Sequence, residues 1–291
     1  MSIDAFQEKI RKTKNPSVLV IEAFSEWIPP HILQESDSVA GACLRYYTEL
    51  LNSLKGLVPG VRFGFGSFGL LGVDGLGVLS KLMNAAKELG FYVLLDAPEQ
   101  LSVQTAKNTA QILAAADSPY PCDGVLFSFW LGSDILKALL PLAQKGKTLF
   151  PVVRTANKSA AEIQDLLTGA RLVHTAAADI VSRQGENIFG KNGYSRICAV
   201  VSAGAPNSIR SIRSGYKYTY MLIDGLEYPS GNHKNCSLAF DRFGYGAVVC
   251  AGPSITAAWK EKGTDGTDFV AQAAEAADRM KKNILRYVTI L

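Results

Sequence analysis

The segment Phe91-Tyr92-Val93-Leu94-Leu95-Asp96, followed by Ala97-Pro98-Glu99-Gln100-Leu101, holds the pattern that decides the fold. Its first five residues are apolar and do not alternate with polar ones, which is typical of a parallel strand covered on both faces. Asp96 places a charge where the strand is expected to end. A proline two positions later fits a strand exit, because its missing amide costs little there. The segment therefore predicts a buried strand that delivers polar side chains to one edge of a parallel sheet.

Seven further short apolar runs, many of them β-branched or aromatic, alternate with segments that have the period of an amphipathic helix. Eight such alternations predict an α/β protein, a single (β/α)8 TIM barrel over residues 1–291, with an extra N-terminal helix at 3–12. The predicted strands are 18–24, 61–66, 91–96, 124–131, 148–155, 196–203, 218–224 and 246–251. The predicted helices that follow them are 37–54, 73–89, 103–116, 133–143, 159–167, 175–184, 206–211, 235–243 and 267–287.

Composition limits the class of protein. With 48% hydrophobic and 19% charged residues, the chain is expected to fold as a globular protein rather than to stay disordered. No apolar run reaches the roughly 18 to 20 residues that span a bilayer, and the N-terminal segment lacks an apolar signal core. We therefore expect a cytoplasmic protein with no membrane partner.

The cysteine content and the net charge limit the kinds of site and binding partner that we expect. The five cysteines are scattered and form no C-x-x-C pair, so the sequence predicts reduced thiols and neither a disulfide framework nor a zinc site. The formal charge of +4 is mild and the basic residues are mostly dispersed, which predicts no nucleic-acid partner. No bound metal and no cofactor are expected.

Polar residues at the predicted strand exits are the candidates for a binding site, because chemistry in such barrels sits at the carboxyl ends of the strands. Several acids and two arginines at one rim predict a polar pocket that binds a small molecule. The alternative for each residue is structural, since such side chains also cap helices or neutralise one another. The candidates are Glu22, Arg62, Asp96, Glu99, Ser128, Arg154, Asn157, Ser202, Gly204, Asp224, Glu227, Gly252 and Ser254.

An ordered series of short motifs runs through the chain. It includes Lys14-Asn15-Pro16-Ser17-Val18, Val61-Arg62, Ser128-Phe129-Trp130-Leu131-Gly132 and Arg154-Thr155-Ala156-Asn157-Lys158-Ser159. In order and spacing the series resembles the orotidine 5'-phosphate decarboxylase superfamily, in particular its longer bacterial subfamily, over nearly the whole chain. The resemblance implies a common barrel fold, and it does not by itself imply activity.

The same resemblance assigns roles to individual positions. In that superfamily a strand ends in Asp-x-Lys-x-x-Asp, where the lysine protonates the carbon that loses carbon dioxide. Here Asp96 is retained, Pro98 stands at the lysine and Leu101 at the second aspartate. Arg62 corresponds to a further lysine, whose compact ammonium it does not reproduce. The ligand-binding positions that the resemblance and the strand exits suggest are Glu22, Glu99, Thr105, Ser128, Arg154, Asn157, Asp224, Gly225 and Gly252.

The phosphate ligands of the family are replaced as well. Its glutamine falls at about Pro229 and its strand-eight arginine at Pro253. Loss of the proton donor and of both phosphate ligands predicts a catalytically inactive barrel that acts as a binding, regulatory or assembly protein. One alternative is a divalent-metal-dependent lyase that uses the carboxylates at the mouth. Another is residual decarboxylation of orotidylate for pyrimidine synthesis, with Arg62 and Glu99 as substitutes.

The resemblance also implies a homodimer. In the family each mouth is completed by the strand-three loop of the neighbouring subunit. Thr105 matches a family residue that also contacts the ligand from that subunit. Leu101 in that loop predicts a more apolar contact than a charged residue would make.

Overall fold

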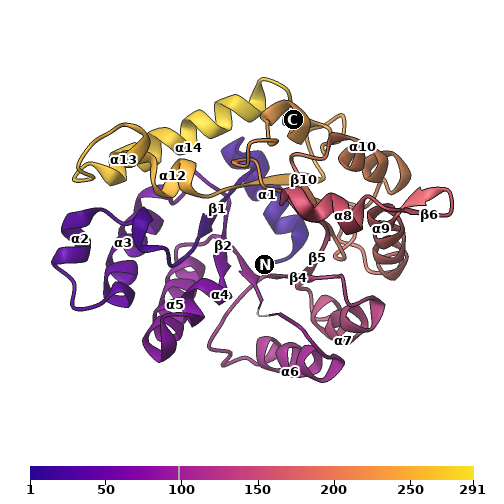
Figure 1. The fold of residues 1–291 in the computed structure, drawn as a ribbon, viewed down its shortest axis with the longest axis horizontal. Helices are drawn as coiled ribbons and strands as arrows, with labels where there is room; N and C mark the ends of the chain where they lie inside the picture. The colour runs from indigo at the N-terminus through magenta and orange to yellow at the C-terminus, as the bar shows by residue number, and fades with distance from the viewer. Residues whose placement is uncertain (98) are drawn as a thin grey trace.

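The computed structural model describes residues 1–97 and 99–291, and its centre is a closed barrel of eight parallel strands (Figure 1). Each strand of the barrel pairs with the barrel strand that precedes it in the chain, and the last one pairs with the first. The strands are β1 Ser17–Ile21, β2 Gly60–Gly64, β3 Tyr92–Asp96, β4 Gly124–Ser128, β5 Thr148–Arg154, β8 Ala199–Ser202, β9 Met221–Asp224 and β10 Ala247–Ala251. The predicted (β/α)8 fold class is confirmed.

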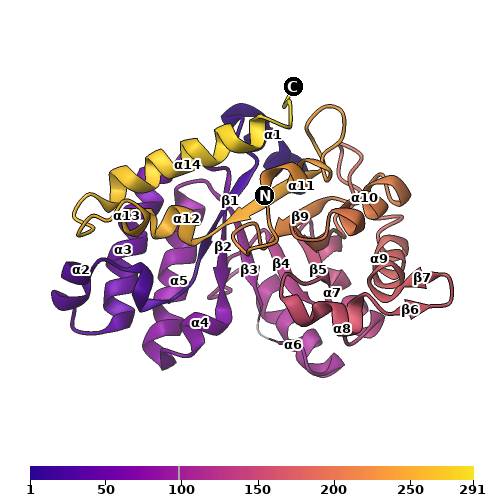
Figure 2. The same ribbon diagram turned by 45° about the horizontal axis from the view of Figure 1, so that its top comes forward.

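Helices surround this barrel on its outer side (Figures 1 and 2). The longer ones are α1 Ile3–Thr13, α3 Val39–Leu54, α5 Gly72–Glu88, α6 Val103–Ala114, α7 Ser133–Gln144, α9 Val173–Gln184, α10 Pro206–Gly215 and α14 Phe269–Leu285. Short helices of five residues or fewer lie in the loops: η1 Ser25–Trp27, α2 Pro30–Gln34, α4 Phe65–Gly69, η2 Lys158–Ala160, α8 Ala161–Gln164, α11 His233–Ser237, α12 Pro253–Thr256 and α13 Ala258–Glu261.

Several predicted boundaries differ from the structure; the first strand, for example, ends at Ile21 instead of 24. Three further differences have a clear structural reason. The second strand stops at Gly64 instead of 66, because α4 begins at Phe65. The predicted helix 159–167 is broken into η2 and α8, and its last residue enters a small antiparallel hairpin formed by β6 Leu167–Thr168 and β7 Arg171–Leu172. Gly169, with φ of +63°, allows the tight turn of that hairpin. The predicted helix 235–243 is only the short α11.

The N-terminal helix α1 closes the amino-terminal end of the barrel. Phe6 is fully buried and stacks on Tyr92 at the start of β3, with ring centroids 4.1 Å apart. A Cβ at Gly60, at the start of β2, would lie 3.0 Å from the Phe6 ring and 2.8 Å from the Tyr92 carbonyl oxygen, so a glycine is needed there. The interior of the barrel is therefore filled at this end, and the cavity described below opens at the opposite end, which we call the mouth.

The strands present apolar side chains along their length and charged ones at the mouth. Val93 and Leu94 inside β3 are fully buried, whereas Asp96, Arg154 and Asp224 are the last residues of β3, β5 and β9. Because all eight strands are parallel, these ends meet at one rim. Across the described part of the chain, no helix has the length and apolar character needed to cross a membrane.

Candidate ligand-binding site

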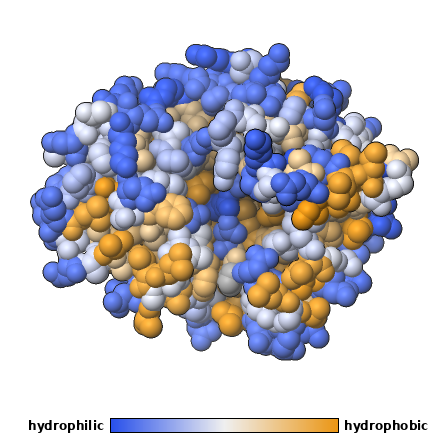
Figure 3. All heavy atoms as spheres, in the orientation of Figure 1, coloured by the Kyte–Doolittle hydropathy of each residue, from blue (hydrophilic) through white to orange (hydrophobic). Residues whose placement is uncertain are grey.

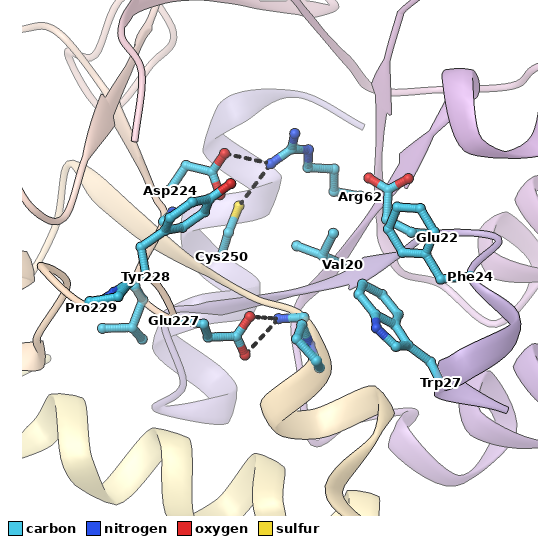
Figure 4. A pocket seen from close by; sticks show the side chains of 14 residues that line it. Val20, Glu22, Phe24, Trp27, Arg62, Asp224, Glu227, Tyr228, Pro229 and Cys250 are labelled. Carbon is cyan, nitrogen blue, oxygen red and sulfur yellow. Dashed lines mark hydrogen bonds and ion pairs between the residues drawn. The ribbon is translucent and has the colours of Figure 1, made fainter. Parts of the chain in front are cut away.

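A cavity of about 400 Å³ opens at the mouth between the ends of β1, β2, β9 and β10 (Figure 4). This volume is in the range of small-molecule sites. In Figure 3 the mouth is a hollow near the centre of the face, with hydrophilic atoms at its floor. The side chains around it combine carboxylates, one guanidinium and aromatic rings. They belong to Val20, Glu22, Phe24, Trp27, Arg62, Asp224, Leu226, Glu227, Tyr228, Pro229, Cys250 and Pro253, with backbone from Gly225 and Gly252.

Arg62 forms the floor of this cavity and links three strands. Its Nη1 donates to Asp224 Oδ2 at 3.0 Å and lies 3.9 Å from the Cys250 sulfur, and its Nη2 donates to Asp96 Oδ2. The Arg62 side chain is only 12% exposed. Burial acts to lower the pKa of Arg62, but the carboxylates of Asp96 and Asp224 outweigh it and raise the pKa well above its ordinary value. The guanidinium therefore stays protonated and cannot act as a general acid or base near neutral pH.

Glu22 follows β1 and is partly buried against the backbone of β2. Its carboxylate fills the space where a Cβ of residue 64 would be, so Gly64 is required for this packing. The Tyr47 hydroxyl donates to the Glu22 backbone oxygen at 2.6 Å and holds the chain in place. Burial raises the pKa of Glu22, against the opposing effects of a hydrogen bond with Ser67 and of the positive charge of Arg62. Glu22 is a desolvated carboxylate, and among residues 1–97 and 99–291 no cation forms an ion pair with it.

Glu227 lies on the other side of the cavity and binds backbone amides. Both of its carboxylate oxygens accept from the Gly252 amide at 3.1 Å, and Oε1 accepts from the Ser254 amide at 2.8 Å. Burial raises the pKa of Glu227, while the hydrogen bonds from Ser254 and Gly252 act to lower it. The carboxylate of Glu227, in the loop after β9, thus already accepts hydrogen bonds from the amides of the loop after β10.

Aromatic rings form two sides of the cavity rim. Phe24 and Trp27 follow β1 and pack edge to face, with centroids 5.0 Å apart. The Trp27 backbone oxygen accepts from the Trp259 indole at 3.1 Å, which anchors this loop. Tyr228 follows β9 and lies on the opposite side (Figure 4). These rings were not among the residues that the sequence predicted for the site. Phe24 stood inside a predicted strand, and nothing local distinguishes Trp27 or Tyr228 from core aromatics.

A second cleft, of about 340 Å³, lies beside the first and shares Tyr228 and Pro229 with it. The predicted residues Arg154, Asn157, Ser202 and Gly204 line this cleft rather than the central cavity. Arg154 is held by Asp165 through two bonds of 3.0 Å, so its charge is already neutralised.

The other predicted residues divide into two groups. Ser128 is partly buried at the end of β4, where its hydroxyl accepts from the Trp130 amide at 3.4 Å. Glu99, Leu101 and Thr105 are exposed, and none of them lines the cavity. The Thr105 amide donates to Ser102 Oγ at 3.1 Å as part of the N-cap of α6. The interpretation of Pro98 as a replaced proton donor concerns a position outside the described residues.

Three of the carboxylates at the mouth are engaged separately, Asp96 and Asp224 by Arg62 and Glu227 by backbone amides. Among residues 1–97 and 99–291, no group of three or more His, Cys, Asp or Glu side chains is placed to hold a metal ion. Burial raises the pKa of the Cys250 thiol, so this sulfur is not an activated nucleophile. The arrangement provides shape, fixed charge and aromatic surface for binding.

Comparison with known proteins points to one superfamily, although no family model matches the chain. The orotidine 5'-phosphate decarboxylase of Rhodopirellula baltica is 27% identical over 234 residues, covering 79% of this chain and 78% of that protein. The enzyme of the same name from Caldicellulosiruptor bescii is 24% identical over 298 residues, covering 97% of each.

Solved structures agree on the fold. A putative orotidine 5'-phosphate decarboxylase from Streptomyces avermitilis superposes with a TM-score of 0.79 at 21% identity, over 99% of this chain and 97% of that one. A putative orotidine-monophosphate-decarboxylase from Plasmodium yoelii gives 0.81 at 13% identity, over 98% of each chain. The curated relatives support membership of the orotidine 5'-phosphate decarboxylase superfamily, and the solved structures show the same barrel fold.

Replacing Glu22 with glutamine should stabilise the protein at neutral pH. Because burial raises the folded-state pKa of Glu22 above its ordinary value of 4.5, its ionisation costs stability. The cost is absent below the unfolded-state pKa and grows as pH rises through the folded-state pKa. We expect Glu22→Gln to increase the free energy of unfolding by roughly 1–2 kcal/mol at pH 7 and by little near pH 4, measured by urea denaturation. Glu26→Gln, at an exposed position, is the control. An equal gain at both pH values would contradict this account.

Removing the charge of Arg62 should destabilise the barrel. Arg62→Met leaves Asp96 and Asp224 facing each other without a cation, and we expect a loss of roughly 2–4 kcal/mol. The figure is below that of a fully buried pair because the two carboxylates are 31% and 36% exposed. The triple variant Arg62→Met, Asp96→Asn, Asp224→Asn should recover most of the loss in the same denaturation experiment. A triple variant as unstable as the single one would show that shape rather than charge is responsible.

Proposed function

We propose that this chain is an orotidine 5'-phosphate decarboxylase-like barrel that binds a small molecule at its mouth and does not decarboxylate orotidylate. In this view it acts as a binding, regulatory or assembly protein. Its cytoplasmic location stays a prediction from the sequence.

The state of Arg62 is the observation that carries the proposal. Decarboxylation in the family uses an ammonium that gives its proton to the reacting carbon. Among the described residues that line the cavity there is no lysine, and Arg62 is the one cationic side chain. It is paired with Asp96 and Asp224, and its raised pKa keeps its protons in place. Position 98, where the family lysine would stand, is a proline, which has no ionisable group.

Residual decarboxylation is the second candidate, and the names of the relatives favour it. Eight curated relatives at 23–27% identity are all called orotidine 5'-phosphate decarboxylase. The metal-dependent lyase has less support, because Asp96 and Asp224 are occupied by Arg62, Glu227 by amides, and Glu99 is exposed.

A direct assay separates these candidates. We expect purified protein to leave the absorbance of orotidine 5'-phosphate unchanged under conditions in which the Caldicellulosiruptor bescii relative consumes it. The matched variant is Asp96→Asn, which removes the carboxylate retained from the family signature. Turnover by the unmodified chain that disappears in Asp96→Asn would establish the second candidate and refute inactivity.

We also propose that the chain forms a symmetric dimer through the loops that follow β2, β3 and β4. Leu101, in the loop after β3, is 76% exposed, and exposed apolar side chains indicate an interaction surface where several of them gather. Leu70 and Leu131 in the neighbouring loops and Val73 in the first turn of α5 are exposed as well. Figure 3 shows apolar side chains gathered over α5, α6 and the α8–β6 region of this face. Burial of such side chains against a second copy would stabilise the association.

The dimer is tested by changing Leu101 to glutamate. A charge in an apolar interface costs free energy of desolvation, so Leu101→Glu should shift the protein from dimer to monomer at micromolar concentration in light scattering. Leu57→Glu, at an exposed position beyond α3, is the control and should leave the dimer intact. A monomeric unmodified protein would exclude this assembly.

A further inference from the structure

We propose that the mouth cavity takes an organic cation, a primary ammonium or a guanidinium carried on an apolar or aromatic body, in place of a phosphate ester. This inference rests on the proposed function as a ligand-binding barrel, and it names the class of ligand. Four features of the cavity carry it: its charge, the occupation of its amides, the position of Glu22 and its aromatic rim.

The described lining of the cavity carries more negative than positive charge. Three carboxylates, those of Glu22, Asp224 and Glu227, face a single guanidinium, that of Arg62. Arg62 also has Asp96 as a partner from the strand beside it, so its charge is more than balanced by the two aspartates. An anionic ligand would enter a negative field inside a partly desolvated cavity, whereas a cation would be attracted.

Two backbone amides after β10 that could receive an anion are already in use. The amides of Gly252 and Ser254 point at the Glu227 carboxylate, at distances of 2.8–3.1 Å. A phosphate could bind them only by displacing Glu227 and remaining near its charge, which costs both the existing hydrogen bonds and like-charge repulsion. The hydrogen-bond donors of these two amides are therefore satisfied by the protein itself.

Glu22 is the carboxylate with the most to gain from a cation. It is packed against Gly64, and its side-chain partner, Ser67, is a neutral hydroxyl. The nearest cation, Arg62, directs its terminal nitrogens at the two aspartates. A desolvated carboxylate without a contacting cation gains charge-assisted hydrogen bonds when an ammonium or guanidinium reaches it. Glu22 lines the cavity, so a ligand can make this contact.

The aromatic rim suits the same ligand. In Figure 4 the rings of Phe24 and Trp27 lie on the side of Glu22, and Tyr228 lies across the cavity. Ring faces attract a cation by about 0.5–1 kcal/mol at exposed sites and more where water is excluded. The apolar walls Val20 and Leu226 can cover the body of the ligand. A cation bound here would have a carboxylate on one end and aromatic surface beside it.

The experiment compares isosteric probes by titration calorimetry. The cation is 2-phenylethylamine, the neutral isostere is 2-phenylethanol and the anion is phenyl phosphate; agmatine tests the guanidinium, and uridine 5'-monophosphate tests the nucleotide. We expect the amine to bind at least tenfold more tightly than the alcohol and phenyl phosphate to give no measurable heat. Glu22→Gln should weaken amine binding by about tenfold or more, and Trp27→Leu by roughly three- to fivefold. Glu26→Gln, an exposed neighbour, should bind as the unmodified protein does.

Glu227→Ala provides an independent arm. It removes one carboxylate and frees the amides of Gly252 and Ser254, so phenyl phosphate should gain measurable affinity while the amine loses some. Circular dichroism and thermal melts confirm that each variant is folded.

The outcomes separate this inference from the proposed function. Equal affinity for amine and alcohol, tighter binding of phenyl phosphate or uridine 5'-monophosphate, or no binding of any probe would overturn the cation site while leaving a catalytically inactive barrel. Turnover of orotidine 5'-phosphate would instead overturn the proposed function, whichever probe binds. Amine binding that depends on Glu22 and not on Glu26 supports the inference.

Discussion

A buried guanidinium held between two carboxylates ties three strands of the barrel together at its mouth, and the other features of the site are arranged around it. Arg62 comes from β2, Asp96 from β3 and Asp224 from β9. Such a buried network contributes little net stability compared with apolar packing, but it fixes the positions of the groups it joins. Because these three side chains bind one another, they form a fixed, charged floor of the cavity and are not free to react with a ligand.

The carboxylates that Arg62 does not neutralise define the character of the cavity. Glu227 is satisfied by two backbone amides, whereas the Glu22 carboxylate has only the neutral Ser67 hydroxyl acting to lower its pKa among uncharged groups. Burial raises the pKa of both groups, so each would gain from a positive charge nearby. The barrel therefore keeps the architecture of its decarboxylase relatives while its mouth has the electrostatics of a site for cations. A shared fold positions a pocket without deciding what the pocket binds.

Most of the fold could be predicted because its signals are local. A continuous apolar run such as Tyr92–Asp96 is typical of a strand that is buried on both faces. The amphipathic period of a segment such as Phe269–Leu285 predicts a helix with one buried face. The elements that were missed have no such period. The hairpin of β6 and β7 and the short helices in the loops are too brief to show one, and they form where the chain must cross between packed elements.

The sequence alone was enough to predict the barrel and to place Asp96, Arg154 and Asp224 at the ends of its strands, since both follow from residue type and spacing along the chain. Arg62, expected at a strand exit, lies instead in the middle of β2. Which of these side chains meet was decided by closure of the barrel. Arg62 and Asp224 are 162 positions apart, and the Glu227 carboxylate reaches the Gly252 amide across two strand ends. No local pattern encodes such distances, because electrostatic pairing and desolvation depend on neighbours that only the folded chain brings together.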